Sequence, residues 1–429
     1  QFRTNDCYLI SVDLSGNLME EITFGGTGND FISELTALAN QDFLVGSSYE
    51  NALPDGIDGN VRRYNAELNL LDEIIFGGGN IAFPRFIEEI EPNGDVLISL
   101  TNSELYRYNA NLSDIEWQVT GQSTPTNVQF NEFIDGVRLN DEVYAFTSFS
   151  SETFDNHIVY INILNGEIID DFGLNALTNL TPVGIENINN HLYIVGGETG
   201  QTIFQFDTDT EMVTNMVDIT GINQALAAKS TGQLTIAGMD NQNGAALGRV
   251  VQFSTEELVE EWSAFAGDFS ESVEDFGYSI VESDNESMIL GGLQFSGDNR
   301  FVNIRKIDKN GFVLWETNFN NGQEINAHFG VAASPDGGCV ASYYYSNDNE
   351  NTVGFQKISA TGELEWSQVL DEELRLLQIF GNIIPNMEGG YYFGGSKFVD
   401  GSGFSAYLLK LAEDGSIISE NEYLVEDFT

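Results

Sequence analysis

The chain has 429 residues, of which 41% are hydrophobic and 12% aromatic, so it can bury a sizeable core and is not predicted to be disordered. Its 67 acidic and 16 basic residues give a formal net charge of −51. A surface this acidic repels nucleic acid and anionic lipid, and no run of about 18 apolar residues occurs, so we expect neither a nucleic-acid partner nor insertion into a membrane.

Short alternating strands and glycine turns follow one another from the N-terminus. The first strand runs over residues 8–13, and a Ser15-Gly16-Asn17 turn follows it. Four further turns have the same central glycine, which accepts positive φ without strain: Asn165-Gly166-Glu167, Asn310-Gly311-Phe312, Thr361-Gly362-Glu363 and Asp414-Gly415-Ser416. The last three copies lie 51 and 53 residues apart, and Trp315 and Trp366 lie 51 residues apart. These spacings predict a repeat of about 50 residues.

The strands group into two kinds of hairpin that alternate along the chain. Hairpins that we expect on the outside of each repeat begin near nine positions: Tyr8, Val61, Leu105, Ile158, Ile203, Arg249, Val302, Gly354 and Ala406. Hairpins that we expect on the inside begin near eight: Leu35, Phe86, Phe133, Val183, Ala225, Tyr278, Val331 and Ile383. We therefore predict an all-β fold, a single β-propeller of about eight four-stranded blades over residues 31–429, with an extra N-terminal hairpin within residues 1–30.

The count of hairpins leaves the first one, residues 7–25, without a partner. It adds to the edge of a blade, it completes a blade whose other half lies in a removed segment, or it pairs with a neighbouring molecule. The third alternative follows from the tendency of an exposed apolar strand edge to accept another strand. All three stay open at the level of sequence.

Several segments carry a recognisable consensus. SVDLSGNLMEEITFGGTGND (residues 11–30) and KIDKNGFVLWETNF (306–319), with the glycine turns at 336–339 and 388–395, resemble the repeats of bacterial secreted and cell-surface β-propeller proteins of the Bacteroidetes type, which are often exported by the type IX pathway. The resemblance covers nearly the whole chain and is strongest over 1–80 and 276–429. It implies an extracellular, cell-surface location and no shared catalytic residues. The chain opens without a signal-peptide pattern, so we expect that any secretion signal has already been removed.

Oxygen-rich loops recur between the inner and outer hairpins. Their aspartates are Asp55, Asp58, Asp298, Asp348 and Asp400. Calcium takes about six to eight oxygen ligands, so these aspartates are candidate calcium ligands, although we predict that the protein requires no cofactor. The alternative is that the loops are ordinary turns, because the same residue types favour turns and no loop has EF-hand spacing.

The sequence contains no recognisable catalytic motif. His157, His191 and His328 lack metal-ligand spacing and are predicted to be structural, and no nucleophile elbow or phosphate-binding loop occurs. Carboxylates are so abundant that their pairs are uninformative, although a propeller hydrolase would place two or three in a central funnel. We therefore expect a protein that is not an enzyme.

Two sets of apolar residues have both a structural and a functional interpretation. Cys7 and Cys339 are predicted to be small buried side chains, with one disulfide between them as the alternative. The aromatic runs at 343–345 and 391–393 are predicted to pack between blades, with a carbohydrate-stacking surface as the alternative.

These observations favour a non-catalytic extracellular β-propeller that acts as a structural or adhesive component of the cell surface and is capable of self-assembly. Its expected partners are further copies of itself, other surface proteins and glycans. The alternative is a glycan- or peptide-binding module that uses the central face of the propeller. A propeller hydrolase or lyase is the third class, and convergent carboxylates with raised pKa values would favour it.

Overall fold

The computed structural model describes residues 7–12, 18–24, 30–40, 42–50, 57–65, 68–76, 82–90, 93–120, 132–150, 155–174, 182–196, 201–219, 222–230, 233–242, 245–266, 279–284, 287–296, 299–320, 324–347, 350–369, 383–385, 390–399 and 403–423. Every regular element in these ranges is a β-strand. Over the same ranges, the structure holds no helix of the length and apolarity that crossing a bilayer demands.

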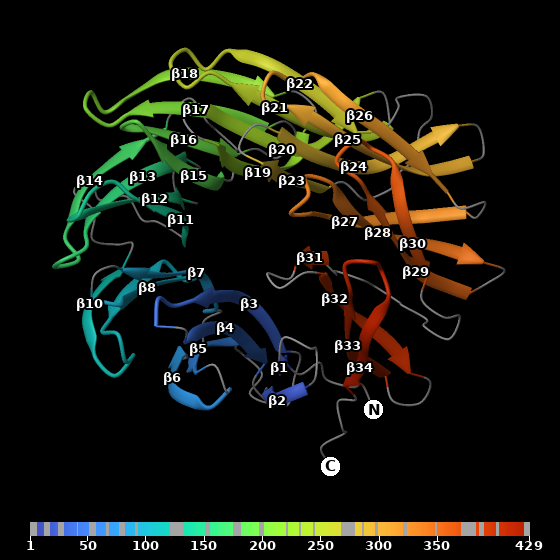
Figure 1. Ribbon diagram of the computed structural model, residues 1–429. Coiled ribbons are helices and arrows are strands. Elements are labelled where there is room, and N and C mark those ends of the chain that lie inside the picture. The colour runs from blue at the N-terminus through green and yellow to red at the C-terminus, as the bar shows by residue number, and fades with distance from the viewer. Residues whose placement is uncertain are drawn as a thin grey trace. The chain divides into compact units, whose positions relative to one another are not determined.

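The chain divides into two compact units, which are described separately (Figure 1). Unit 1 comprises Gln1–Ser11 and Met19–Ile219, and unit 2 comprises Val12–Leu18 and Thr220–Thr429. The N-terminal hairpin, β1 (Cys7–Val12) and β2 (Leu18–Phe24), forms a two-stranded sheet. Among the described strands, β1 and β2 pair only with each other, so they do not extend the edge of another sheet.

Unit 1 contains four antiparallel sheets, each made of four consecutive strands. The first sheet is β3 (Asp30–Ala37), β4 (Phe43–Glu50), β5 (Ile57–Tyr64) and β6 (Leu70–Phe76); the second is β7 (Pro84–Ile90), β8 (Asp95–Leu100), β9 (Glu104–Tyr108) and β10 (Ile115–Thr120); the third is β11 (Glu132–Arg138), β12 (Val143–Ser150), β13 (Asp155–Asn162) and β14 (Ile168–Gly173); the fourth is β15 (Pro182–Ile188), β16 (His191–Gly196), β17 (Gln201–Asp207) and β18 (Met212–Ile219).

Unit 2 also contains four antiparallel sheets, each made of four consecutive strands. The fifth sheet is β19 (Ile222–Ser230), β20 (Gln233–Gln242), β21 (Ala245–Phe253) and β22 (Glu260–Ala266); the sixth is β23 (Ser279–Asp284), β24 (Ser287–Ser296), β25 (Asn299–Asp308) and β26 (Val313–Phe319); the seventh is β27 (Glu324–Ala333), β28 (Cys339–Asn347), β29 (Glu350–Ile358) and β30 (Leu364–Val369); the eighth is β31 (Ile383–Pro385), β32 (Tyr391–Val399), β33 (Gly403–Leu411) and β34 (Ile417–Tyr423). The predicted all-β fold of four-stranded repeats with an extra N-terminal hairpin is therefore confirmed.

The core of each unit lies between successive sheets. All six residues of β8 are buried, because neighbouring sheets cover both faces of this strand. One apolar cluster joins Val61 and Phe76 of the first sheet to Val96 of the second, and another joins Leu97 of the second to Phe146 of the third. The first strands of successive sheets also lie in contact: β3 with β7, β7 with β11 and β11 with β15 in unit 1, and β23 with β27 and β27 with β31 in unit 2.

One local feature recurs in all eight of these sheets. The turn between the third and fourth strands contains a residue with positive φ, and a β-bulge follows at the start of the fourth strand. The positive-φ residues are Leu68, Leu112, Gly166, Glu211, Leu258, Gly311, Gly362 and Gly415. Only half of them are glycine, and each of these four glycines lies against a tryptophan of the preceding sheet.

Candidate functional site: joints and crevices between sheets

A buried cation recurs at one register position of the third strand. Arg63, Arg107, Lys306, Lys357 and Lys410 are each at most 8% exposed. A buried charge is tolerated only when it is paired, and for three of these five cations the partner is an aspartate in or next to the turn between the first two strands of the same sheet. Arg63 Nε lies 2.9 Å from Asp42, Arg107 Nε lies 3.0 Å from Asp95, and Lys357 Nζ lies 2.7 Å from Asp336.

All four tryptophans of the chain fasten one sheet to the next. Each stands on a fourth strand opposite the third-strand position just described, and its indole N–H donates to a turn carbonyl of the following sheet. The bonds are Trp117 to Ile163 (2.8 Å), Trp262 to Lys309 (2.9 Å), Trp315 to Ala360 (2.8 Å) and Trp366 to Glu413 (2.8 Å).

Each indole ring also packs against the positive-φ glycine of that turn. A Cβ built on Gly415 (φ +82°) would lie 2.5 Å from Cδ2 of Trp366, and a Cβ on Gly166 (φ +73°) would lie 2.7 Å from Cδ2 of Trp117. Glycine is therefore required twice at these positions, by the backbone conformation and by the ring. We call this pair of residues a Trp–Gly joint.

A different residue fills the equivalent space between the first and second sheets. The position on β6 opposite Arg63 is Asp72, and the turn of the second sheet carries Leu112 at φ +56°. Leu112 is 5% exposed and packs into the apolar cluster that includes Leu44 and Val61 of the first sheet. We call this arrangement the leucine joint. A third-strand arginine donates to a turn carbonyl in both kinds of joint, Arg63 to Ala110 and Arg107 to Ile163.

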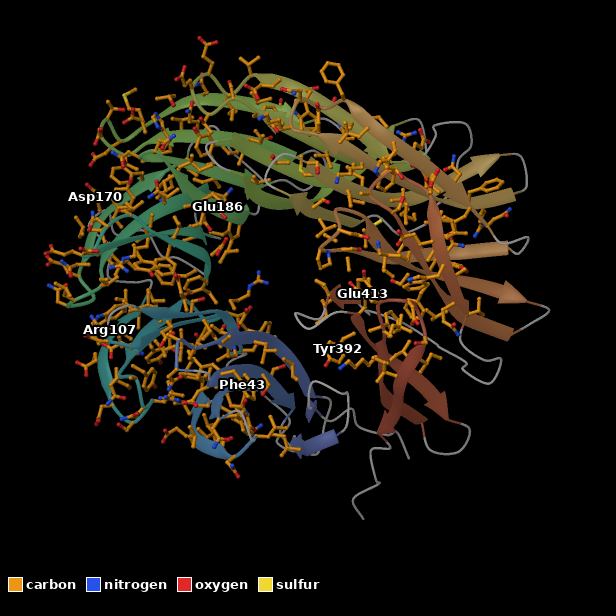
Figure 2. All side chains as sticks on the ribbon, viewed as in Figure 1. Phe43, Arg107, Asp170, Glu186, Tyr392 and Glu413 are labelled. Atoms are coloured by element: carbon orange, nitrogen blue, oxygen red, sulfur yellow. The ribbon has the colours of Figure 1, made fainter. Side chains whose placement is uncertain are left out.

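A cavity of about 400 Å³ opens beside the Trp117 joint, between the second and third sheets (Arg107 is labelled in Figure 2). We call it crevice A. Its lining is Ile90, Asn93, Arg107, Arg138, Asp141, Ile163 and Leu164. Arg138 Nη2 lies 2.9 Å from Asp141, whose side chain is 98% exposed, so water competes with this ion pair and a ligand could replace it. The guanidinium, amide and carboxylate groups beside an apolar wall can hydrogen-bond a sugar or a peptide.

A second cavity, of about 340 Å³, lies at the equivalent place beside the Trp366 joint, between the seventh and eighth sheets. We call it crevice B. Its lining is Ser334, Pro335, Asp336, Lys357, Glu365, Trp366, Tyr391, Glu413 and Asp414. Four carboxylates therefore face one ammonium group. Burial opposes the ionisation of Asp336, but the hydrogen bond from Lys357 and the backbone N–H of Gly338 outweigh it and lower the pKa of this carboxyl.

Three carboxylates with raised pKa values lie on the first strands of unit 1. Burial is the largest cause of the raised pKa of Glu34, Glu88 and Asp135, and the charge of Asp135 adds to it at both glutamates. Asp135 accepts hydrogen bonds from the backbone N–H groups of Gly136 (2.9 Å) and Ile185 (3.1 Å), which ties β11 to β15. The hydroxyl of Tyr144 donates to Glu88.

The calcium prediction stays a prediction. Of the five aspartates, only Asp58 lies in the described part of the chain, on β5, where it is 9% exposed. Asp55, Asp298, Asp348 and Asp400 lie outside the described residues. Within the ranges that the structure describes, no group of three or more histidine, cysteine, aspartate or glutamate side chains is arranged to hold a metal ion.

The described histidine and cysteine side chains are buried or contact other parts of the protein. His157 is buried, with Nδ1 3.8 Å from Asp171, and His191 Nδ1 donates to the backbone carbonyl of Asn189 (3.1 Å). Cys339 is a free thiol rather than half of a disulfide, and burial raises its pKa to about 12.

The aromatic runs pack as predicted where their side chains are described. Tyr343 packs on Phe319 of the preceding sheet, with ring centroids 5.2 Å apart. Tyr391 and Phe393 are buried in a cluster shared by the seventh and eighth sheets.

The joints are the residues whose roles sequence reasoning missed. Tryptophans and glycine turns served as markers of the repeat, with no indication that one touches the other. A signal was present, because each tryptophan is followed by a turn glycine at a nearly constant spacing: 49 residues from Trp117 to Gly166, 49 from Trp262 to Gly311, 47 from Trp315 to Gly362 and 49 from Trp366 to Gly415.

Comparison with known proteins shows the fold alone. No known protein family and no curated protein sequence matches the chain significantly. Among solved structures, the C-terminal WD40 domain of Sif2 aligns over 95% of this chain and 99% of its own, with a TM-score of 0.51 and 12% identity.

Two further structures align less well. They are BamB from Moraxella catarrhalis (85% and 89% covered, TM-score 0.41, 10% identity) and a europium-containing methanol dehydrogenase (86% and 84% covered, TM-score 0.44, 11% identity). The fold assignment rests on the WD40 domain, whose blades of four-stranded sheets correspond to the repeats of this chain. The protein has a β-propeller fold.

Proposed function

We propose that this protein is a non-catalytic extracellular scaffold, a structural or adhesive component of the cell surface that holds binding surfaces on rigid sheets. One observation carries the proposal: the charged and aromatic residues of the repeat consensus are used to fasten sheets to one another. Arg107 and Trp117 both donate to the carbonyl of Ile163 in the next sheet, and Lys306 donates to the carbonyl of Gly337 in the next sheet (2.7 Å). What recurs is a stabilising joint rather than a reactive group.

The location is carried by the resemblance of the sequence to secreted repeat proteins. The net charge of −51 also suits a protein that must stay soluble at a crowded surface, because like-charged molecules repel one another. The same repulsion means that self-assembly would need a bridging cation, and the predicted calcium ligands Asp55, Asp58, Asp298, Asp348 and Asp400 are the candidates for it.

A second candidate function is a glycan- or peptide-binding module. Crevice A favours it, because Arg138, Asp141 and Asn93 surround a cavity of about 400 Å³ with an apolar wall. Such a lining can orient a polar ligand while an apolar face of the ligand is removed from water.

The proposal is tested with the purified chain on an array of glycans and peptides and on intact source cells. Light scattering with calcium and with a chelator reports assembly, and mass spectrometry of the array eluates reports turnover. We expect labelling of the chain by a membrane-impermeant reagent on intact cells, binding to cells or array, and no product. Released oligosaccharide or peptide fragments would contradict the non-catalytic proposal, and resistance to labelling would contradict the surface location.

A further inference from the structure

The fourth strands expose apolar side chains at their starts. Opposite the third-strand residue that follows the β-bulge stand six apolar residues, each between 36% and 54% exposed: Leu70, Ile115, Val213, Val313, Leu364 and Ile417. The fourth strand is the last in its sheet, so one of its sides has no strand partner among the described residues. Exposed apolar residues on an unpaired strand edge favour the addition of another strand.

The edge strand of the fourth sheet exposes three apolar residues. On β18, Met212 is 63% exposed, Met216 is 51% exposed and Val213 is 36% exposed. Val213, Met216 and Asp218 stand opposite Phe206, Phe204 and Thr202 of β17, so these three residues share one face of the sheet. Methionine is flexible and polarisable and adapts to many partner side chains, which suits it to a binding surface.

Charge distinguishes this edge from the others. Residues 182–219 contain six acidic residues and no lysine or arginine. Glu211, just before β18, and Asp218, near its end, are both exposed; Asp207 ends β17, and Asp209 lies in the turn between the two strands. On the sixth sheet, by contrast, the exposed residues Val313 and Leu314 precede Glu316, which is already paired with Arg305 at 3.1 Å.

We propose that β18 binds an extended segment of a partner protein, apolar in its middle and basic at both ends, added to the fourth sheet as a further strand. Main-chain hydrogen bonds along the free side of β18 would align the segment. Its central apolar residues would cover Met212 on one face of the sheet and Val213 and Met216 on the other. The lysines or arginines at its ends would meet Glu211 and Asp218. A second copy of this chain is disfavoured as the occupant because each copy carries a charge of −51.

The inference rests on the proposed function only in treating the protein as a scaffold that holds partners. The test uses the purified full chain and a synthetic lysine–valine peptide with valines in its middle and lysines at both ends. A glutamate–valine peptide of the same length and arrangement serves as a probe of charge. We expect the lysine–valine peptide to bind and to slow hydrogen exchange of the β18 amides, and the glutamate–valine peptide not to bind.

Two variants of β18 and one matched control locate the site. Met212→Ser/Met216→Ser is expected to weaken binding of the lysine–valine peptide about 10-fold. Glu211→Gln/Asp218→Asn is expected to weaken it several-fold and to flatten its salt dependence. Leu314→Ser, an equally exposed apolar residue on β26, is expected to leave binding unchanged.

Three results would overturn the inference: equal loss of binding in Leu314→Ser and Met212→Ser/Met216→Ser, equal binding of both peptides, or a dimer in light scattering that the methionine variant dissociates. Because none of these readouts depends on cellular location, the scaffold proposal could fail on intact cells while the peptide site stands.

Discussion

Unit 1 contains both kinds of joint, and their difference shows what the fold requires. Between the second and third sheets, Trp117 reaches across to Gly166 from the preceding sheet. Between the first and second sheets, Leu112 fills the space from the following sheet, and Asp72 stands where the tryptophan would be. In these two joints, the space between the turns is filled once, from one side or the other. Tryptophan and glycine are therefore a coupled pair, and leucine replaces both.

The largest expected effect comes from the arginine that both joints share. Arg63→Ala and Arg107→Ala should each lower the free energy of unfolding by about 3–5 kcal/mol, because Asp42 or Asp95 is left without its partner in a buried site. Urea titration measures the change. Arg62→Ala is the matched control: it removes the more exposed pair with Glu73 (2.6 Å), at a cost of about 1 kcal/mol or less. Equal costs for Arg62 and Arg107 would show that the cations do not fasten the sheets.

A smaller effect is expected from the leucine joint. Leu112→Gly should lower the free energy of unfolding by about 2 kcal/mol, because the lost burial of the side chain exceeds the relief of its positive φ. The same urea titration applies. If the variant were as stable as the parent or more stable, Leu112 would be a strained turn residue rather than the residue that fills the joint.

Two carboxyls, Asp336 of unit 2 and Glu88 of unit 1, should make the free energy of unfolding depend on pH with opposite signs. Asp336 has a lowered pKa, so its stabilising contribution is present above its ordinary value of 3.8 and is lost as pH falls through the folded pKa. Glu88 has a raised pKa, so stability falls as pH rises from its ordinary value of 4.5 through the folded pKa. Asp336→Asn should therefore flatten the acid limb of a stability–pH curve, and Glu88→Gln should raise stability at neutral pH. A stabilising Asp336→Asn at neutral pH would refute the first assignment.

The smallest effect concerns the buried thiol. With its pKa raised to about 12 and no exposed surface, Cys339 should not react with a thiol reagent in the folded protein at neutral pH. Reaction should appear only with unfolding, at the midpoint of the urea transition. Fast labelling of Cys339 in native protein would mean that the seventh sheet opens locally.

The repeat and the fold class followed from local patterns, whereas the joints did not. Alternating strands and turns such as Asn310-Gly311 have a short-range signature, so they predict hairpins and their pairing into four-stranded sheets. Leu112 has positive φ but lies in an Asn-Leu-Ser sequence that no turn rule marks. The contact between Trp366 and Gly415 spans 49 residues and depends on how one sheet packs on the next. Crevices A and B depend on the same packing of sheets, so neither could be located from the sequence alone.

A double-mutant cycle on Trp366 and Gly415 tests the coupled-pair account most directly. Gly415→Ala should cost about 2–3 kcal/mol in the parent, where the new Cβ meets both positive φ and the indole ring 2.5 Å away. In the Trp366→Ala background it should cost only about 1 kcal/mol, because the backbone strain alone remains. A coupling energy of about 1 kcal/mol or more is the result that the account predicts. Additive costs would contradict it, because Gly415 would then serve the turn alone and the tryptophan would be independent of it.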